Sequence, residues 1–173
     1  MSRQNDRKQK NIDMERLIDL YGDKLLRLCY LYLHDYQLAE DALQETYVKV
    51  FRNFYRFEGK SSEKTWMTRI AINVCKSYLR SPWEQKVFYG DLELKRRDER
   101  ETWEMKIADD TVIVSIYQLK PKYREVVLLF YYQELKVAEI AQILEISQSA
   151  VTVRLTRARE QLKKKLEGWY FDE

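Results

Sequence analysis

Basic and hydroxyl side chains gather near the C-terminal end of the chain, where they have the clearest chemical purpose. Between Arg154 and Lys165, six basic residues stand against one acid, Glu160. Such a density of cations favours a polyanion alongside, because binding releases the counterions that the polyanion had condensed. The hydroxyls of Thr152 and Thr156 can reach base edges and phosphates. The segment is therefore a candidate nucleic-acid contact.

The pattern around this segment predicts a helix-turn-helix that would position it. A short apolar helix is predicted over residues 137–144, and Ser147 is a suitable N-cap for a longer helix to about Leu166. A basic run alone is more often a solvated face, but on the third helix of such a unit it indicates DNA contact. The buried stripe of the longer helix is predicted to comprise Val151, Leu155, Ala158, Leu162 and Leu166.

Helical periodicity also organises the N-terminal half of the chain. It predicts one helix over Met14–Leu33 and a second to about Phe54, with Asp35 as N-cap and Phe51 on the apolar side. The stretch FEGKSSE, residues 57–63, predicts a loop, and a third helix should follow over 64–79 before Pro82. In the C-terminal half, Pro121 fits a first helical turn.

Composition supports an all-α fold of two small helical domains joined by a linker. The 173 residues include only four Gly and two Pro, with 45% hydrophobic and 34% charged residues. We expect domains over 13–81 and 116–168, with a linker over 82–115 that carries nine acidic and six basic residues. The two mildly basic ends suit contact with nucleic acid.

Several functional classes are disfavoured by what the sequence lacks. It shows no Gly-rich phosphate loop and no metal-ligand spacing, and its one histidine, His34, stands at a predicted helix junction. Cys29 and Cys75 lie among apolar residues and are predicted to be buried structural thiols. No window approaches the roughly 18 apolar residues of a membrane span. We therefore expect a cytoplasmic protein that is not an enzyme and needs no metal, cofactor or small-molecule substrate.

Two motif blocks resemble a known family. The segment REVVLLFYYQELKVAEIAQILEISQSAVTVRLTRAREQL resembles region 4 of the extracytoplasmic-function (ECF) sigma factors of the sigma-70 family. The segments AEDALQETYVKVF and FEGKSSEKTWMTRIAINVCKSYLR are similar to region 2 of the same family. The two blocks come in the expected order and span nearly the whole chain. The resemblance implies a factor that brings core RNA polymerase to promoter DNA and helps to open it.

The resemblance also implies roles for individual residues. Region 4 would bind the −35 element, and the basic and hydroxyl residues that suit this contact are Ser149, Thr152, Arg154, Thr156, Arg157 and Arg159. Region 2 would bind the −10 element and take a flipped base into its loop. The matching residues are Gly59, Lys60, Ser61 and Ser62 in the loop and Asn73, Lys76 and Arg80 on the following helix. Trp66 is expected in the core rather than in a stacking platform.

Partners follow from the resemblance as well. In the family, a polar helix face docks on the coiled-coil clamp of the polymerase, and here that face would comprise Asp41, Gln44, Glu45 and Lys49. The polymerase flap and an anti-sigma factor, membrane-bound in many relatives, are further expected partners. The excess of acidic residues in the linker would suit a path through the positively charged nucleic-acid channels of the polymerase. The same composition is also ordinary for a soluble linker between two domains.

Two departures from the family pattern bear on function. Many members begin the recognition helix with Gly-Thr-Val-Arg or Gly-Thr-Val-Lys, whereas this chain has Ser149-Ala150-Val151-Thr152, without the basic residue. Its −35 preference is therefore expected to differ. Glu134 stands where a glycine is common in the turn between the first two helices of region 4, so that turn is expected to be altered.

Two other hypotheses stay open at this point. A free-standing helix-turn-helix regulator, binding DNA without polymerase, explains the C-terminal half equally well but leaves the N-terminal motifs unexplained. The other is a helical adaptor or an enzyme, and a hydrolytic activity would have to depend on carboxylates that show no paired spacing. Co-purification with core polymerase would distinguish the first alternative from a sigma factor.

Overall fold

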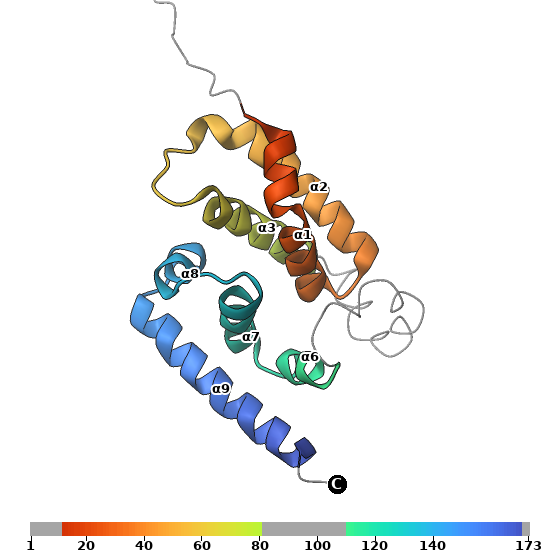
Figure 1. Ribbon diagram of the computed structural model, residues 1–173, viewed down its shortest axis with the longest axis vertical. Coiled ribbons are helices and arrows are strands. Elements are labelled where there is room, and N and C mark those ends of the chain that lie inside the picture. The colour runs from red at the N-terminus through yellow and green to blue at the C-terminus, as the bar shows by residue number, and fades with distance from the viewer. Residues whose placement is uncertain (1–11, 81–109, 171–173) are drawn as a thin grey trace, which may run out of the picture.

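The N-terminal unit is a bundle of three main helices. The computed structural model describes residues 12–80 and 110–170, and within these ranges the regular elements are helical (Figure 1). The elements of this unit are α1 (Met14–Leu33), α2 (Tyr36–Asn53), the short 3₁₀ turn η1 (Phe54–Arg56) and α3 (Glu63–Leu79). The predicted helix over Met14–Leu33 is confirmed at both ends.

The C-terminal unit consists of four helices and one π-helical turn. They are α6 (Asp110–Tyr117), α7 (Pro121–Val127), the π turn η3 (Leu128–Tyr132), α8 (Val137–Leu144) and α9 (Gln148–Tyr170). The segment predicted as a linker, partly helical at most, ends at residue 115, and its residues 110–115 are helical in α6. That helix packs against α9, so tertiary contacts stabilise an element too short to show a clear periodicity. The remaining linker residues, 82–109, lie outside the described part of the chain.

Capping side chains explain where several helices begin. Asp35 accepts a hydrogen bond from the backbone N–H of Leu38 at 3.0 Å, as predicted for the start of α2. Ser147 accepts one from Ala150 at 3.1 Å at the start of α9, again as predicted. Each cap satisfies a backbone donor that the first helical turn leaves without a partner.

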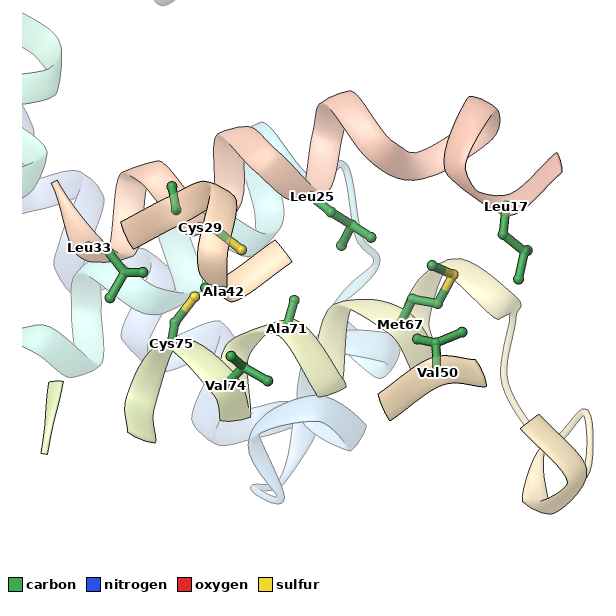
Figure 2. Close-up of a cluster of buried hydrophobic side chains, with 11 residues drawn as sticks. Leu17, Leu25, Cys29, Leu33, Ala42, Val50, Met67, Ala71, Val74 and Cys75 are labelled. Atoms are coloured by element: carbon green, nitrogen blue, oxygen red, sulfur yellow. The ribbon is translucent and has the colours of Figure 1, made fainter. Parts of the chain in front are cut away.

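The core of the N-terminal unit forms where α1, α2 and α3 meet (Figure 2). Leu17 and Leu25 of α1 pack with Val50 of α2 and with Met67 and Ala71 of α3, all at most 2% exposed. Leu17 and Leu25 lie eight residues apart on α1, and Met67 and Ala71 lie four apart on α3, so each pair shares one face of its helix. The loop before α3 and the exposed face of α2 are therefore held on a packed scaffold.

The two cysteines face each other within this core, Cys29 from α1 and Cys75 from α3 (Figure 2). Both are free and buried, as predicted. The hydrogen bond to Cys29, together with burial, raises the pKa of the Cys75 thiol well above its usual range. The thiol therefore stays protonated at neutral pH.

We expect both thiols to resist alkylation in the native protein, because the thiolate is the reactive species and neither sulfur is open to solvent. Iodoacetamide labelling followed by intact-mass measurement would show no added mass under native conditions. In urea two groups should be added. Rapid native labelling would contradict the buried placement.

The two helical units share buried side chains. Leu28 of α1 and Ile72 of α3 pack in one cluster with Val126, Leu129 and Ile140 of the C-terminal unit. Leu31 of α1 belongs to a second cluster, which includes Leu119, Leu128 and Ala158. Leu28, Leu31 and Ile72 are at most 1% exposed. The units thus pack directly on each other (Figure 1), which the sequence pattern of two linked modules did not predict.

Candidate nucleic-acid interface

Helix α9 has one buried face and one exposed face. Val151, Leu155 and Ala158 are at most 3% exposed, which confirms most of the predicted stripe. On the other face Thr152 donates its hydroxyl hydrogen to the carbonyl of Gln148 at 3.0 Å, and Thr156 donates to that of Thr152 at 3.1 Å. Each exposed hydroxyl oxygen keeps its acceptor capacity for an outside donor, such as an amino group on a base edge.

Two arginines of α9 are positioned by aromatic residues of the preceding helices. Arg157 is exposed, and its hydrogen bond to the Tyr123 hydroxyl lowers the pKa of that phenol. Arg159 donates from Nε to the Tyr131 hydroxyl at 2.8 Å, and its guanidinium lies 5.4 Å from the centre of the Phe130 ring. Such contacts fix long side chains that would otherwise lose much conformational entropy on binding.

The other predicted residues of this surface lie near the start of α9. Ser149 is exposed, with its hydroxyl 3.0 Å from that of the capping Ser147. Arg154 is half-buried. All six predicted −35 residues thus belong to one helix, and five of them are exposed.

The loop before α3 brings together the small and polar residues that the sequence singled out. Gly59 has a φ of 73°, a left-handed conformation that glycine adopts without a steric penalty. The ammonium group of Lys60 pairs with the carboxylate of Glu58. Ser62 caps α3: its hydroxyl oxygen accepts a hydrogen bond from the backbone N–H of Thr65 at 3.0 Å. This hydroxyl therefore stabilises the start of the helix.

A cavity of about 270 Å³ opens beside this loop. Trp66 lines it, is half-buried and packs against the core of the N-terminal unit, with its ring tilted against that of Phe57 at 5.1 Å between ring centres. The wall includes residues of both units, namely Lys60, Ser61, Thr65, Trp66, Arg69, Gln142 and Ile143. An aromatic wall with basic and hydroxyl groups suits a nucleobase attached to a phosphate.

The remaining −10 candidates occupy one face of α3. Asn73 and Lys76 of α3 and Arg80, which caps its C-terminal end, follow each other at three- and four-residue steps, so they share that face. Asn73 and Arg80 are exposed. Lys76 instead forms a 2.6 Å ion pair with Glu125 of the C-terminal unit. Arg69 lies one turn earlier on the same face, and sequence reasoning had not included it.

The polar face of α2 combines charged and apolar side chains. Asp41, Gln44 and Lys49 are exposed, and Lys49 pairs with Glu45 at 2.7 Å. The prediction that Phe51 lies on the apolar inner side is wrong, because its side chain is 61% exposed. Helix α2 buries only a narrow stripe of side chains, so Phe51 points to solvent. Val48 is 46% exposed and lies beside Phe51 at the edge of the polar face. The three-residue spacing of Val48 and Phe51 could have indicated that both lie on this exposed face.

Within residues 12–80 and 110–170, no helix is long and apolar enough to cross a membrane. Over the same ranges, no three histidine, cysteine, aspartate or glutamate side chains gather into a possible metal site.

Family models match both units in the order of the chain. The model of sigma-70 region 2 matches residues 17–85, and the model of sigma-70 region 4 matches residues 112–162. The ECF RNA polymerase sigma factor SigW of Bacillus subtilis is 31% identical over 164 residues, covering 87% of each protein. The RNA polymerase sigma-H factor of Pseudomonas aeruginosa is 32% identical over 163 residues, covering 87% of this chain and 84% of the relative.

Solved structures show the same fold. CnrH, in complex with the cytosolic domain of CnrY, matches with a TM-score of 0.67 and 22% identity over 90% of this chain and 88% of that one. The sigma factor RpoE of Bartonella quintana, in complex with the anti-sigma factor NepR, matches with a TM-score of 0.67 and 19% identity. The match covers 93% of this chain and 99% of that one. The two family models and the curated relatives above establish that the chain belongs to the ECF RNA polymerase sigma factors of the sigma-70 family.

Proposed function

We propose that this sigma factor binds core RNA polymerase, directs it to specific promoters and helps to melt the −10 element. The observation that carries this function is the ordered match of regions 2 and 4 to two helical units, each with a nucleic-acid candidate surface. The polymerase supplies the catalysis, and this protein supplies promoter choice without chemistry of its own. Its site of action would be the cytoplasm, where promoter DNA lies.

The exposed face of α9 is the −35 reader in this proposal. Arg157 would contact a base edge or phosphate, with Tyr123 holding its guanidinium in place. Ser149, Thr152, Thr156, Arg154 and Arg159 would complete the contact. Because Thr152 replaces a basic residue of the usual pattern, a neutral hydroxyl stands at that position, and the preferred −35 sequence should differ from that of relatives with Arg or Lys.

The loop before α3 and the face that follows are the −10 reader. A base pulled from the stack would enter between the loop residues Gly59–Ser62 and Trp66. The strand beyond it would run along Asn73, Lys76 and Arg80 on α3. Amide and cationic side chains on this face suit bases and phosphates.

The α2 face would dock on the clamp coiled coil of the polymerase. Asp41, Gln44, Glu45 and Lys49 supply charge and hydrogen bonds, and Val48 and Phe51 add apolar area at the end of the same stripe. Region 4 would meet the flap. An anti-sigma factor, membrane-bound as for many relatives, is proposed as the regulator, since the matched RpoE structure holds its anti-sigma factor.

Replacing Arg157 with alanine should weaken binding of the holoenzyme to upstream promoter DNA about tenfold, because one charge-assisted contact is lost. Gel shifts with reconstituted holoenzyme and promoter fragments would measure this loss. Lys136→Ala, at an exposed lysine outside the basic segment of α9, is the control. An Arg157→Ala affinity equal to that of the wild type would remove this residue from the −35 contact.

The decisive test is in vitro transcription with purified core polymerase on a library of promoter fragments, with and without the protein. Initiation at a defined subset of fragments supports the proposal and reveals both DNA elements. The absence of new initiation, combined with DNA binding by the protein alone, would favour a free-standing regulator instead.

A further inference from the structure

An exposed apolar side chain, Val153, lies at the centre of the solvent face of α9. Its side chain is 48% exposed. Helix α9 packs against α6, α7 and α8 along one side, and its other side has no neighbouring helix in the described part of the chain (Figure 1). At about 3.6 residues per turn, position 153 points almost directly away from the buried stripe of Val151, Leu155 and Ala158.

The neighbours of Val153 on this face are residues assigned above to the −35 element. Ser149 precedes it by one helical turn, and Thr156 and Arg157 follow it by one turn. Residues at such spacings have Cβ atoms about 5–6 Å apart on a helix surface. Val153 therefore lies inside the proposed DNA contact. Because basic and hydroxyl side chains defined that contact in the sequence, Val153 was not included in it.

The fold of the C-terminal unit gives no reason for a valine at this position. A β-branched residue is less favourable than alanine, lysine or glutamate at an exposed position within a helix. The buried clusters of the described C-terminal unit are built from Val151, Leu155 and Ala158 of the opposite face, and Val153 is not part of them. A residue that breaks a local rule without a gain in packing indicates a functional position.

Charge is divided unevenly along the exposed face. Its first two turns carry the uncharged residues Ser149, Thr152, Val153 and Thr156, and the cation Arg157 comes after them. In a helix-turn-helix, the N-terminal residues of the recognition helix contact base edges, whereas phosphates are bound mainly by cations. The neutral part of α9 is thus placed for base edges. Among the groups that base pairs present in the major groove, the apolar one is the 5-methyl group of thymine.

Given the function proposed above, we propose that Val153 recognises a thymine of the −35 element by packing its γ-methyl groups against the 5-methyl group of that base. In a helix, valine has one strongly preferred rotamer, so these methyl groups keep a fixed direction and lose little freedom on binding. Cytosine offers an amino donor in the major groove and no methyl group, and a valine leaves that donor without a partner.

The test removes only the methyl group from the DNA. It uses a promoter fragment that the reconstituted holoenzyme transcribes. Each thymine of the upstream element, on either strand, is replaced in turn by deoxyuridine, which pairs identically and lacks the 5-methyl group. Gel shifts compare holoenzymes that carry the wild-type chain or Val153→Ala. Alanine at this exposed position is a strong helix former, so α9 should stay folded.

We expect one deoxyuridine to lower the affinity of the wild-type holoenzyme about fourfold, the effect of burying one methyl group. The Val153→Ala holoenzyme should bind the thymine and deoxyuridine forms of that fragment equally. Thr152→Ser and Thr156→Ser are matched controls, since each removes a neighbouring methyl group and keeps the hydroxyl. Both should retain the fourfold sensitivity.

Three results would overturn the inference. The first is a wild-type affinity that no deoxyuridine lowers, which includes an upstream element without thymine. The second is an equal loss in Val153→Ala, because the effect would then arise from the DNA or from another residue. The third is a sensitivity that disappears in a threonine variant and persists in Val153→Ala.

Transcription with the same fragments separates this inference from the proposed function. If the wild-type chain directs initiation and every deoxyuridine is tolerated, only the role of Val153 is excluded. If the chain directs no initiation from any fragment, the proposed function fails, and the thymine contact that rests on it fails as well.

Discussion

Promoter-specific transcription should fall about a hundredfold when Asp41 and Gln44 are both replaced by lysine. Both side chains are exposed on α2, so the fold should be preserved. If this face docks on the polymerase clamp, two added cations would remove attraction and introduce like-charge contacts, which cost several kcal/mol. About 3 kcal/mol corresponds to roughly a hundredfold loss of affinity. A titration of labelled protein with core polymerase, together with run-off transcription, measures both quantities.

The control is Asp19→Lys, a charge reversal at an exposed position of α1. It should leave polymerase affinity within about twofold of the wild type. Circular dichroism would verify that each variant keeps its helical content. Wild-type affinity in the Asp41 and Gln44 double variant would exclude these residues from the docking face and leave Val48 and Phe51 to be tested.

The second large effect is expected on stability. Replacing Leu129 with alanine should lower the free energy of unfolding by about 2–5 kcal/mol, because the side chain is fully buried and its loss leaves a cavity. Leu129 lies in the π turn η3 and packs in the cluster that holds α8 and α9 against α3. The damage should therefore spread to the recognition helix. Urea denaturation followed by circular dichroism gives the change in midpoint.

Leu20→Ala is the matched control, since the same atoms are removed from a leucine that is 56% exposed. The free energy of unfolding should then change by no more than about 0.5 kcal/mol. Equal midpoints for the two variants would contradict the buried placement of Leu129.

Local signals predicted most helix positions. The bounds Met14–Leu33 and Val137–Leu144 and the caps at Asp35 and Ser147 are confirmed. Each depends on residues within a few positions of one another, so the sequence carries the information directly. The start of α6 at Asp110 was missed because two helical turns are too short for a clear period, and the contact with α9 stabilises them.

The candidate surfaces were predicted less completely, because exposure depends on partners distant in sequence. Phe51 looks apolar and inward along its own helix, yet no neighbouring helix covers it in the described structure. Lys76 fits a DNA contact by position, but Glu125, far along the chain, pairs with it. Arg69 lies within the segment that resembles region 2 but was assigned no contact there, and its neighbours in space reveal its place beside the cavity. The roles of these residues remain proposals that the experiments above address.

Glu134 and Glu145 adopt left-handed backbone angles, with φ of 53° and 56°, and the choice of glutamate at these positions has a genetic consequence. Every glutamate codon becomes a glycine codon by one change, from A to G, at its second base. At Glu134 or Glu145 that single mutation would relieve the backbone strain and delete the ion pair with Lys24 or Arg69 in the same step. A lineage can therefore loosen the contact between the two units without losing the fold of either one, and the reverse mutation restores it.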